Sequence, residues 1–209
     1  MKKSIFLSFL FVVSVISFSC KSEKKETTPS VKEVVVKKSN AAFSLENAKN
    51  EINFTAYKTT DKVPVGGQFK KVNITANGEG NSIKEAIHNT EFSIPVSSLF
   101  TKDSSRDYKI KKFFFSVMDA TKLLSGKLVI ENDSTGYANI KMNGITNKVP
   151  FIYTIAANTF SMKAKMDVAN WNALEALNSL NVVCKELHKG ADGVSKTWSE
   201  VSLNITSTF

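Results

Sequence analysis

The chain has 209 residues, of which 42% are hydrophobic and 10% aromatic, which is enough for one globular domain with a substantial core and argues against a disordered chain. The formal net charge is +9, yet Arg106 is the only arginine among the 28 basic residues. Because bidentate contacts to bases and phosphates favour arginine, this composition argues against nucleic-acid binding and favours attraction to an anionic membrane surface.

The first 20 residues have the pattern of an export signal. Lys2 and Lys3 precede a 14-residue apolar run, Ile5–Phe18, which is shorter than the roughly 20 residues that a spanning helix needs. The run ends in Ser19 and Cys20, an arrangement that resembles the lipobox of bacterial lipoproteins, in which the cysteine is acylated. We expect residues 1–20 to be a signal peptide and Cys20 to be the lipidation site; an ordinary signal peptide cut nearby is the alternative.

Residues 21–41 are rich in lysine, glutamate, serine and threonine, which predicts a flexible tether. Roughly 20 flexible residues would reach about 25 Å. Lys21 and Ser22 lack the aspartate that commonly retains lipoproteins at the inner membrane, so we expect an exported protein anchored in the outer membrane and facing the periplasm or the cell surface. Acylation of Cys20 would leave Cys184 as a lone thiol, which we interpret as a small core residue.

From residue 42 onward apolar and polar residues alternate, which predicts half-buried strands. The short links between them favour antiparallel neighbours, and the Gly66–Gly67 pair predicts a bulge or a sharp coil at a barrel corner. Eight strands would close into an antiparallel barrel whose interior holds only side chains or one small ligand. The predicted strands centre on Ile52–Ala56, Phe69–Ala76, Phe92–Val96, Leu124–Ile130, Ala138–Met142, Val149–Ile155, Phe160–Val168 and Val201–Phe209.

Two segments read as helices. Ser105–Lys112 has little β-character and follows capping residues such as Asp103, so we expect a short lid helix across the barrel mouth. From Asn170 the apolar period becomes 3.6, and Gly190 would end this amphipathic helix. Its predicted apolar stripe is Trp171, Leu174, Leu177, Leu180, Cys184 and Leu187. The predicted fold class is therefore all-β: an eight-stranded antiparallel barrel with a short lid helix and one C-terminal amphipathic helix.

Three segments, Gly67–Val72, Ser105–Phe114 and Asn143–Phe151, resemble motifs of the YceI-like family of exported bacterial proteins. They are similar to its glycine-x-phenylalanine strand, its arginine-aspartate signature followed by phenylalanine, and its glycine-x-threonine turn. The resemblance covers residues 42–209 and implies a lipocalin-like barrel that holds an amphiphile, since some members hold a polyisoprenoid. Many members carry a histidine-serine pair on the first strand. That pair is absent at residues 51–57, so the resemblance does not identify the ligand.

The candidate ligand contacts are phenylalanines. Phe113, Phe114 and Phe115 form either an apolar mouth that grips an alkyl or isoprenoid chain or the packed end of the barrel, and the sequence leaves both interpretations open. Arg106 with Asp107 can anchor a ligand head group or provide structural ion pairing that fixes the lid. We favour the structural role, because adjacent side chains on a short helix diverge and seek separate partners. The other candidate ligand contacts on the predicted strands are Phe54, Phe92, Phe151 and Phe160.

The sequence offers no catalytic or metal-binding pattern. His88 and His188 lie far apart without acidic or thiol companions at ligand spacing, and no nucleophile elbow or glycine loop is present, so we expect no enzyme, metal or cofactor. We predict a lipid-anchored protein that holds or sequesters an isoprenoid-like or other lipid ligand. The alternative is a surface or periplasmic interaction module with a solid barrel. Interior volume distinguishes them, and a homodimer is left open.

Overall fold

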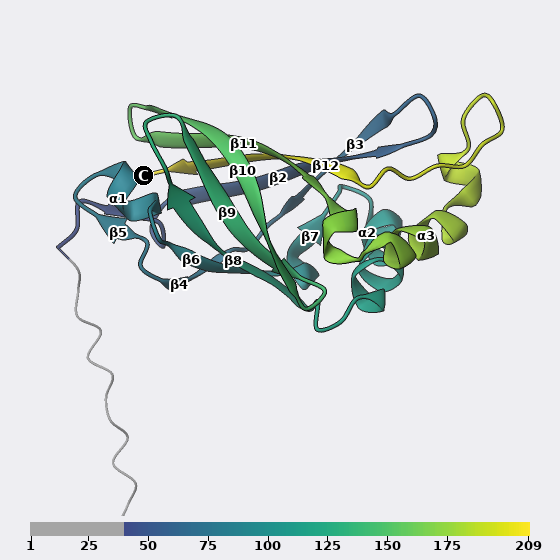
Figure 1. Cartoon of the computed structure of the whole chain (residues 1–209), viewed down its shortest axis with the longest axis horizontal. Helices are drawn as coiled ribbons and strands as arrows, with labels where there is room; N and C mark the ends of the chain where they lie inside the picture. Colours follow the sequence, from purple (N-terminus) through teal and green to yellow (C-terminus); the bar gives the residue numbers. More distant parts are fainter. Residues whose placement is uncertain (1–39) are drawn as a thin grey trace, which may run out of the picture. The chain divides into compact units, whose positions relative to one another are not determined.

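The computed structural model describes residues 40–209 (Figure 1). The predicted signal peptide, the lipidation site Cys20 and nearly all of the predicted tether lie outside the described residues. The described chain forms a curled antiparallel sheet with helices at its two ends. Its fold is mostly β, as the alternating sequence predicts, and the sheet has the form of a half-barrel rather than the closed barrel that we expected.

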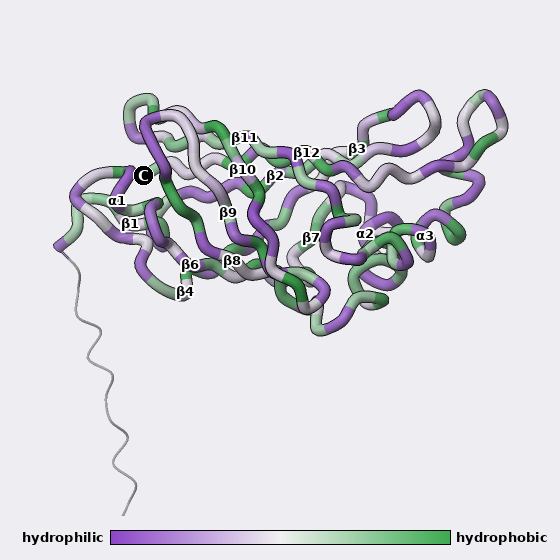
Figure 2. Tube along the Cα trace, in the orientation of Figure 1, coloured by the Kyte–Doolittle hydropathy of each residue, from purple (hydrophilic) through white to green (hydrophobic). Residues whose placement is uncertain are grey.

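One sheet contains ten strands in the order β4-β6-β8-β9-β10-β11-β12-β2-β3-β7, and every neighbouring pair is antiparallel. Its long central strands alternate between hydrophobic and hydrophilic residues along their length (Figure 2). A separate two-stranded ladder joins β1 to β5. The strands are β1 Phe43–Ser44, β2 Lys49–Lys58, β3 Val63–Phe69, β4 Asn73–Ala76, β5 Glu79–Gly80, β6 Glu91–Pro95, β7 Leu99–Phe100, β8 Leu123–Ile130, β9 Thr135–Met142, β10 Ile145–Ala156, β11 Thr159–Asp167 and β12 Glu200–Thr208.

The predicted count of eight strands is too low, because the short strands β1, β5 and β7 were not predicted and one predicted strand is divided in two. The predicted strand Phe69–Ala76 is divided into the end of β3 and the whole of β4, which lie at opposite sides of the sheet order. The chain leaves the ladder after Phe69, where the Lys70 amide donates to the Ser98 carbonyl at 3.0 Å. Short β7 then covers the edge of β3, so in the described chain β3 and β4 share no ladder and the sheet remains open between them.

Gly66 and Gly67 do not form the predicted bulge. The register between β2 and β3 runs without interruption from Ile52 opposite Phe69 to Lys58 opposite Val63. The irregularity lies instead between β4 and β6, where the register shifts between Ile74 and Ala76. The glycine is needed for close packing rather than for a bend, because the ring of Phe54 lies against Gly67.

The lid helix is confirmed as α2, Ser104–Phe113, and the Asp103 side chain caps it by accepting from the Arg106 amide at 3.0 Å. α2 packs beside α3, Leu174–Val183, at one end of the sheet, which we call the helical end (Figure 1). A helix that the sequence did not predict, α1 at Ile83–Ile87, covers the other end. Four 3-10 segments complete the chain: η1 Val96–Ser98, η2 Phe115–Val117, η3 Val168–Trp171 and η4 Lys185–His188.

The predicted helix from Asn170 to Leu187 is shorter and interrupted. Asn172 adopts a left-handed conformation with φ 54°, which ends η3 and shifts the phase of the apolar stripe before α3 begins. Trp171 is consequently buried in the core, where its Nε1 donates to the Ile140 carbonyl at 2.9 Å. Leu174 and Leu187, predicted to face the sheet, are 55% and 58% exposed. Within residues 40–209, none of the helices has the length and apolar character needed to span a membrane.

Candidate functional site

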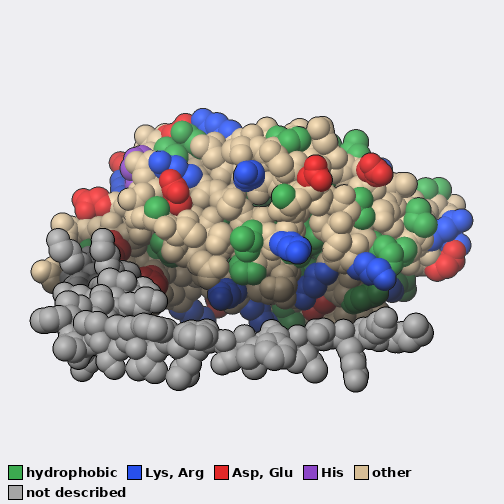
Figure 3. Space-filling model, turned by 90° about the horizontal axis from the view of Figure 1, so that it is seen from below, with side chains coloured by type: hydrophobic (Ala, Val, Ile, Leu, Met, Phe, Trp, Pro, Cys, Tyr) green, Lys and Arg blue, Asp and Glu red, His purple; other side chains and the backbone are tan. Residues whose placement is uncertain are grey.

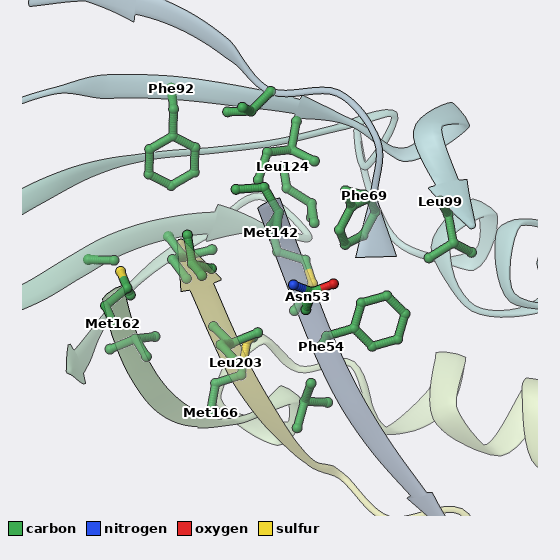
Figure 4. Close-up of a pocket in the computed structure, with 18 of the residues that line it drawn as sticks. Asn53, Phe54, Phe69, Phe92, Leu99, Leu124, Met142, Met162, Met166 and Leu203 are labelled. Atoms are coloured by element: carbon green, nitrogen blue, oxygen red, sulfur yellow. The ribbon is translucent and has the colours of Figure 1, made fainter. Parts of the chain in front are cut away.

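The interior of the curled sheet encloses a cavity of about 220 Å³. This is far more than the ~10–15 Å³ that one water molecule needs, so the barrel is hollow rather than filled by its own side chains. Side chains from β3, β6, β8, β9, β11 and β12 face the space (Figure 4). From the helical end, Ile110 on α2 and Leu177 and Leu180 on α3 reach the same cavity.

Two glycines let aromatic rings lie close to the cavity wall. Phe54 on β2 is paired with Gly67 on β3, and Phe92 on β6 is paired with Gly126 on β8. A Cβ at Gly67 would lie 2.3 Å from Cζ of Phe54, and one at Gly126 would lie 2.8 Å from Cζ of Phe92. Each ring therefore occupies the space that a side chain on the next strand would need. The rings line the cavity instead of crossing it.

Polar side chains at the α1 end of the cavity are already paired within the protein. The Ser207 hydroxyl donates to Asn50 Oδ1 at 2.6 Å, and Asn50 Nδ2 donates to the Leu45 carbonyl at 2.7 Å. Thr90 donates its hydroxyl to the Ala86 carbonyl at 2.5 Å. These groups need no ligand to satisfy them, so this part of the lining recognises apolar surface and shape.

The three consecutive phenylalanines divide between two environments. Phe114 and Phe115 are buried and line the cavity, and Phe115 extends an aromatic row through Phe69 to Phe54, with ring centroids 6.2 and 5.6 Å apart. Phe113 does not line the cavity, and its ring lies 6.4 Å from the exposed Tyr108 ring. Phe113 is the last residue of α2 and Phe114 is its C-cap, and consecutive side chains at a helix end point in different directions, which the run of identical residues could not indicate.

Among the other predicted contacts, Phe54, Phe92 and Phe160 line the cavity. Phe151 is buried behind it, opposite Gly136 and next to Phe160, at a ring-centroid distance of 6.5 Å. The sequence reasoning missed Phe69, which lies in the middle of the aromatic row. The sequence did contain a sign of this position. Phe69 lies two residues after Gly67 on the same strand, so both residues are on the same face of the sheet.

Arg106 lies outside the cavity lining and has partners of its own. Its Nη2 is 3.5 Å from Asp103 Oδ2 and its Nη1 donates to the Thr101 carbonyl at 3.4 Å. Asp107 pairs separately, because its Oδ1 accepts from both the amide and the hydroxyl of buried Thr101, at 2.8 and 2.7 Å. The two side chains thus fix the start of α2 to Thr101, each through partners of its own.

The buried thiol and imidazole lie at the helical end. Burial raises the pKa of the Cys184 thiol, and burial lowers the pKa of His188, whose Nδ1 is 2.6 Å from Thr197 Oγ1. The positive charges of nearby Lys58 and Lys109 lower the pKa of both groups. Residues 40–209 contain no cluster of histidine, cysteine and carboxylate side chains that could hold a metal ion.

Basic side chains are dispersed over the outer surface. On the face in Figure 3 lysines and arginine lie among polar and acidic side chains rather than in one continuous patch. Several exposed lysines are occupied locally: Lys148 is 3.0 Å from Glu131 and lies 3.8 Å from the ring centroid of Tyr137.

The fold is shared with solved structures. A polyisoprenoid binding domain from Saccharophagus degradans, implicated in plant cell wall breakdown, is 10% identical with a TM-score of 0.53, over 76% of this chain and 93% of that one. BcnA from Burkholderia cenocepacia is 14% identical with a TM-score of 0.52, over 80% of this chain and 99% of that one. At these identities the likeness concerns the fold alone.

A comparison with curated proteins finds no match. The model of the YceI-like domain, in contrast, matches residues 43–209, from β1 through the last residue of the chain. The match includes all three of the segments that resemble the family's motifs. The chain therefore belongs to the family of proteins with a YceI-like domain.

Proposed function

We propose that this protein binds one apolar or amphipathic chain molecule, of isoprenoid or other lipid type, inside the curled sheet, and carries or sequesters it without chemical change. The observation that supports this most directly is the hollow interior, about 220 Å³ and lined largely by apolar side chains. This volume is below the ~300–1,000 Å³ typical of drug-sized sites, which favours a narrow chain over a bulky ring system. The polyisoprenoid binding of the Saccharophagus neighbour agrees with this ligand class.

The alternative function, an interaction module with a solid barrel, is less well supported. It requires that Phe54, Phe92, Phe160, Met162 and Met166 fill the interior. These side chains instead line an open space. On the face shown in Figure 3 the basic side chains are dispersed, so that face offers no concentrated surface for a polyanion.

The ligand proposal is tested by filling the cavity. Leu203 on β12 faces the cavity, whereas its neighbour Asn204 is exposed on the other face of the sheet. Leu203→Trp should abolish co-purification of apolar small molecules, detected by native mass spectrometry of protein isolated from its own membranes. Asn204→Trp adds the same ring outside and should retain the ligand. An empty wild-type protein, or equal ligand content in both variants, would contradict the proposal.

We also propose that an acyl chain on Cys20 anchors the protein in the outer membrane. This rests on the sequence of the export signal and on the basic residues that follow it. Cys20→Ala should move the protein from the membrane fraction to the soluble fraction. Cys184→Ala removes the other cysteine, which is buried in the domain, and should leave the fractionation unchanged. Membrane retention of Cys20→Ala would argue against acylation.

A further inference from the structure

Exposed apolar side chains gather on the outer side of the helical end. Most of the large hydrophobic side chains that are exposed within residues 40–209 lie on α2, on α3 or on the segments directly after them. The most exposed of these are Val182, Leu187 and Tyr108, at 64%, 58% and 56%. Single apolar side chains are normal on a protein surface, whereas a group of them at one end indicates an interaction surface.

Hydrogen bonds hold together the segments that carry these side chains. Asn143, in the turn between β9 and β10, accepts from the Asp119 amide at 2.8 Å and donates to the Trp171 carbonyl at 2.8 Å. The loop that follows η2 is thereby joined to the loop that precedes α3, and α3 packs against both α2 and η2. Exposed Val117 and Leu174 consequently belong to one surface, and Figure 3 shows hydrophobic side chains beside basic ones toward this end.

An aromatic pair with a lysine forms the α2 part of this surface. Phe113, which does not line the cavity, lies with its ring 6.4 Å from that of Tyr108. The Lys112 Nζ donates to the Tyr108 hydroxyl at 2.8 Å and lies 5.3 and 5.4 Å from the centroids of the two rings. Tyrosine and lysine each combine an apolar body with a polar tip, which suits the boundary between lipid chains and head groups.

The charge of this segment is complementary to anionic lipid. The chain from residue 101 to residue 123 contains six basic and three acidic residues. Two of the acids act within the protein, because Asp103 caps α2 and Asp107 accepts from Thr101. Within the described part of the chain, none of the lysines in this segment forms an ion pair with a carboxylate. The segment therefore keeps an excess of positive charge, which attracts anionic head groups.

We propose that the helical end docks on the surface of a lipid bilayer that contains anionic lipids. Apolar side chains would enter the boundary between head groups and acyl chains, and the lysines of α2 would lie among the head groups. We call the apolar residues the docking surface: Tyr108, Phe113, Val117, Leu123, Leu174 and Val182.

This proposal goes beyond ligand binding and beyond the proposed anchor. The predicted tether enters the domain just before β1, which lies beside α1 at the end opposite the helical end. The anchor alone would therefore not turn the helical end toward the membrane. The tether is long enough to allow it, since roughly 20 residues extend up to about 70 Å, whereas β10, the longest strand with 12 residues, spans about 40 Å.

The test measures how deeply each end of the domain enters the bilayer. Full-length protein is reconstituted in phosphatidylcholine vesicles, with and without phosphatidylglycerol, that contain lipids with a nitroxide on the acyl chain. An NBD fluorophore is attached at Val182→Cys or, as the matched control, at Ile152→Cys on β10, where the native side chain is 63% exposed. Cys184 is buried, and unsubstituted protein treated with the same dye gives the background. We expect the nitroxide to quench the probe at position 182, more strongly with phosphatidylglycerol, and to leave the probe at position 152 unquenched.

Variants in the Val182→Cys protein separate the docking surface from general exposure and charge. Leu174→Ser should lower the ratio of docked to undocked domain about tenfold. Lys112→Gln should lower it about fivefold, and only in the vesicles that contain phosphatidylglycerol. Ile155→Ser and Lys165→Gln, on the sheet, should change neither value. All four native side chains are exposed, and thermal unfolding checks that each variant remains folded.

Three results would overturn the docking proposal. Equal quenching at positions 182 and 152 would mean that the anchor holds the domain near the bilayer without a preferred face. Absence of quenching at position 182 would mean that the helical end does not enter the bilayer. A shift of the probe emission that depends on protein concentration and needs no lipid would show that a second copy of the chain covers this surface. Native mass spectrometry of the same samples reports the ligand separately, so loss of docking with the ligand retained would leave the proposed function intact.

Discussion

Phe54 on β2 lies opposite Gly67 on β3, with its ring in the space that a side chain at position 67 would occupy, 2.3 Å from the ideal Cβ to Cζ of the ring. The same ring packs against Phe69, at a centroid distance of 5.6 Å, and lines the cavity. The absence of a side chain at one position thus decides where an aromatic ring lies on the neighbouring strand and how much of the interior remains open.

Gly67→Ala should push the Phe54 ring toward the cavity and lower the free energy of unfolding by about 1–3 kcal/mol. The adjacent Gly66→Ala is the matched control, because a Cβ there meets nothing within 4 Å and should leave stability unchanged or slightly higher. Urea denaturation measures both. The same substitution can be made in the Phe54→Leu protein. If Gly67→Ala lowered the free energy of unfolding as much there as in the wild type, the clash with the ring would not be the cause.

Asn143→Ala should lower the free energy of unfolding by about 1–3 kcal/mol, because its side chain joins two segments. Its Oδ1 accepts from the Asp119 amide at 2.8 Å, its Nδ2 donates to the Trp171 carbonyl at 2.8 Å, and its φ of 51° disfavours alanine. Asn158→Ala, in another exposed turn, removes an amide with no side-chain bond within the described chain and is the control. Equal midpoints in thermal unfolding would contradict this role.

Asp107→Ala should destabilise the protein more than Arg106→Ala. The Asp107 carboxylate satisfies both the amide and the hydroxyl of Thr101, which is only 6% exposed, so its loss should cost about 1–3 kcal/mol. The half-exposed pair between Arg106 and Asp103 should contribute less than about 1 kcal/mol. Chemical denaturation of the two variants gives the order, and the reverse order would show that the arginine fixes the helix.

Protonation of His188 should make the protein less stable in mild acid. Its pKa is lowered in the folded state by burial and then by the positive charges of Lys58, Lys109 and Arg106, so the unfolded chain binds the proton more readily. The stability that neutral His188 contributes is thus fully present above the ordinary histidine pKa and is lost as the pH falls below it. His188→Gln should remove this part of the pH dependence and keep a partner for Thr197. Urea midpoints between pH 5 and 8 that fall equally in both proteins would contradict the assignment.

Local pattern in the sequence predicted much of the fold. The period-two alternation of β8 to β12 located these strands, since each lies in a regular antiparallel ladder. Asp103 and the polar residues after it predicted α2, because a capping side chain acts within one helical turn. The three motif segments also identified the family whose model matches residues 43–209.

The directions of the side chains that form the site were decided by contacts between residues that are distant in the sequence. The direction of each phenylalanine depends on cross-strand register and on where a helix ends, which is why Phe113, the last residue of α2, and Phe114, its C-cap, separate and why Phe69 joins the aromatic row. Ile110 of α2 and Leu177 of α3 likewise reach the cavity that Phe54 of β2 lines. Residues so distant in the chain share no local period, and only the curvature of the sheet, which sets which strands and helices meet, brings their side chains to one end of the cavity.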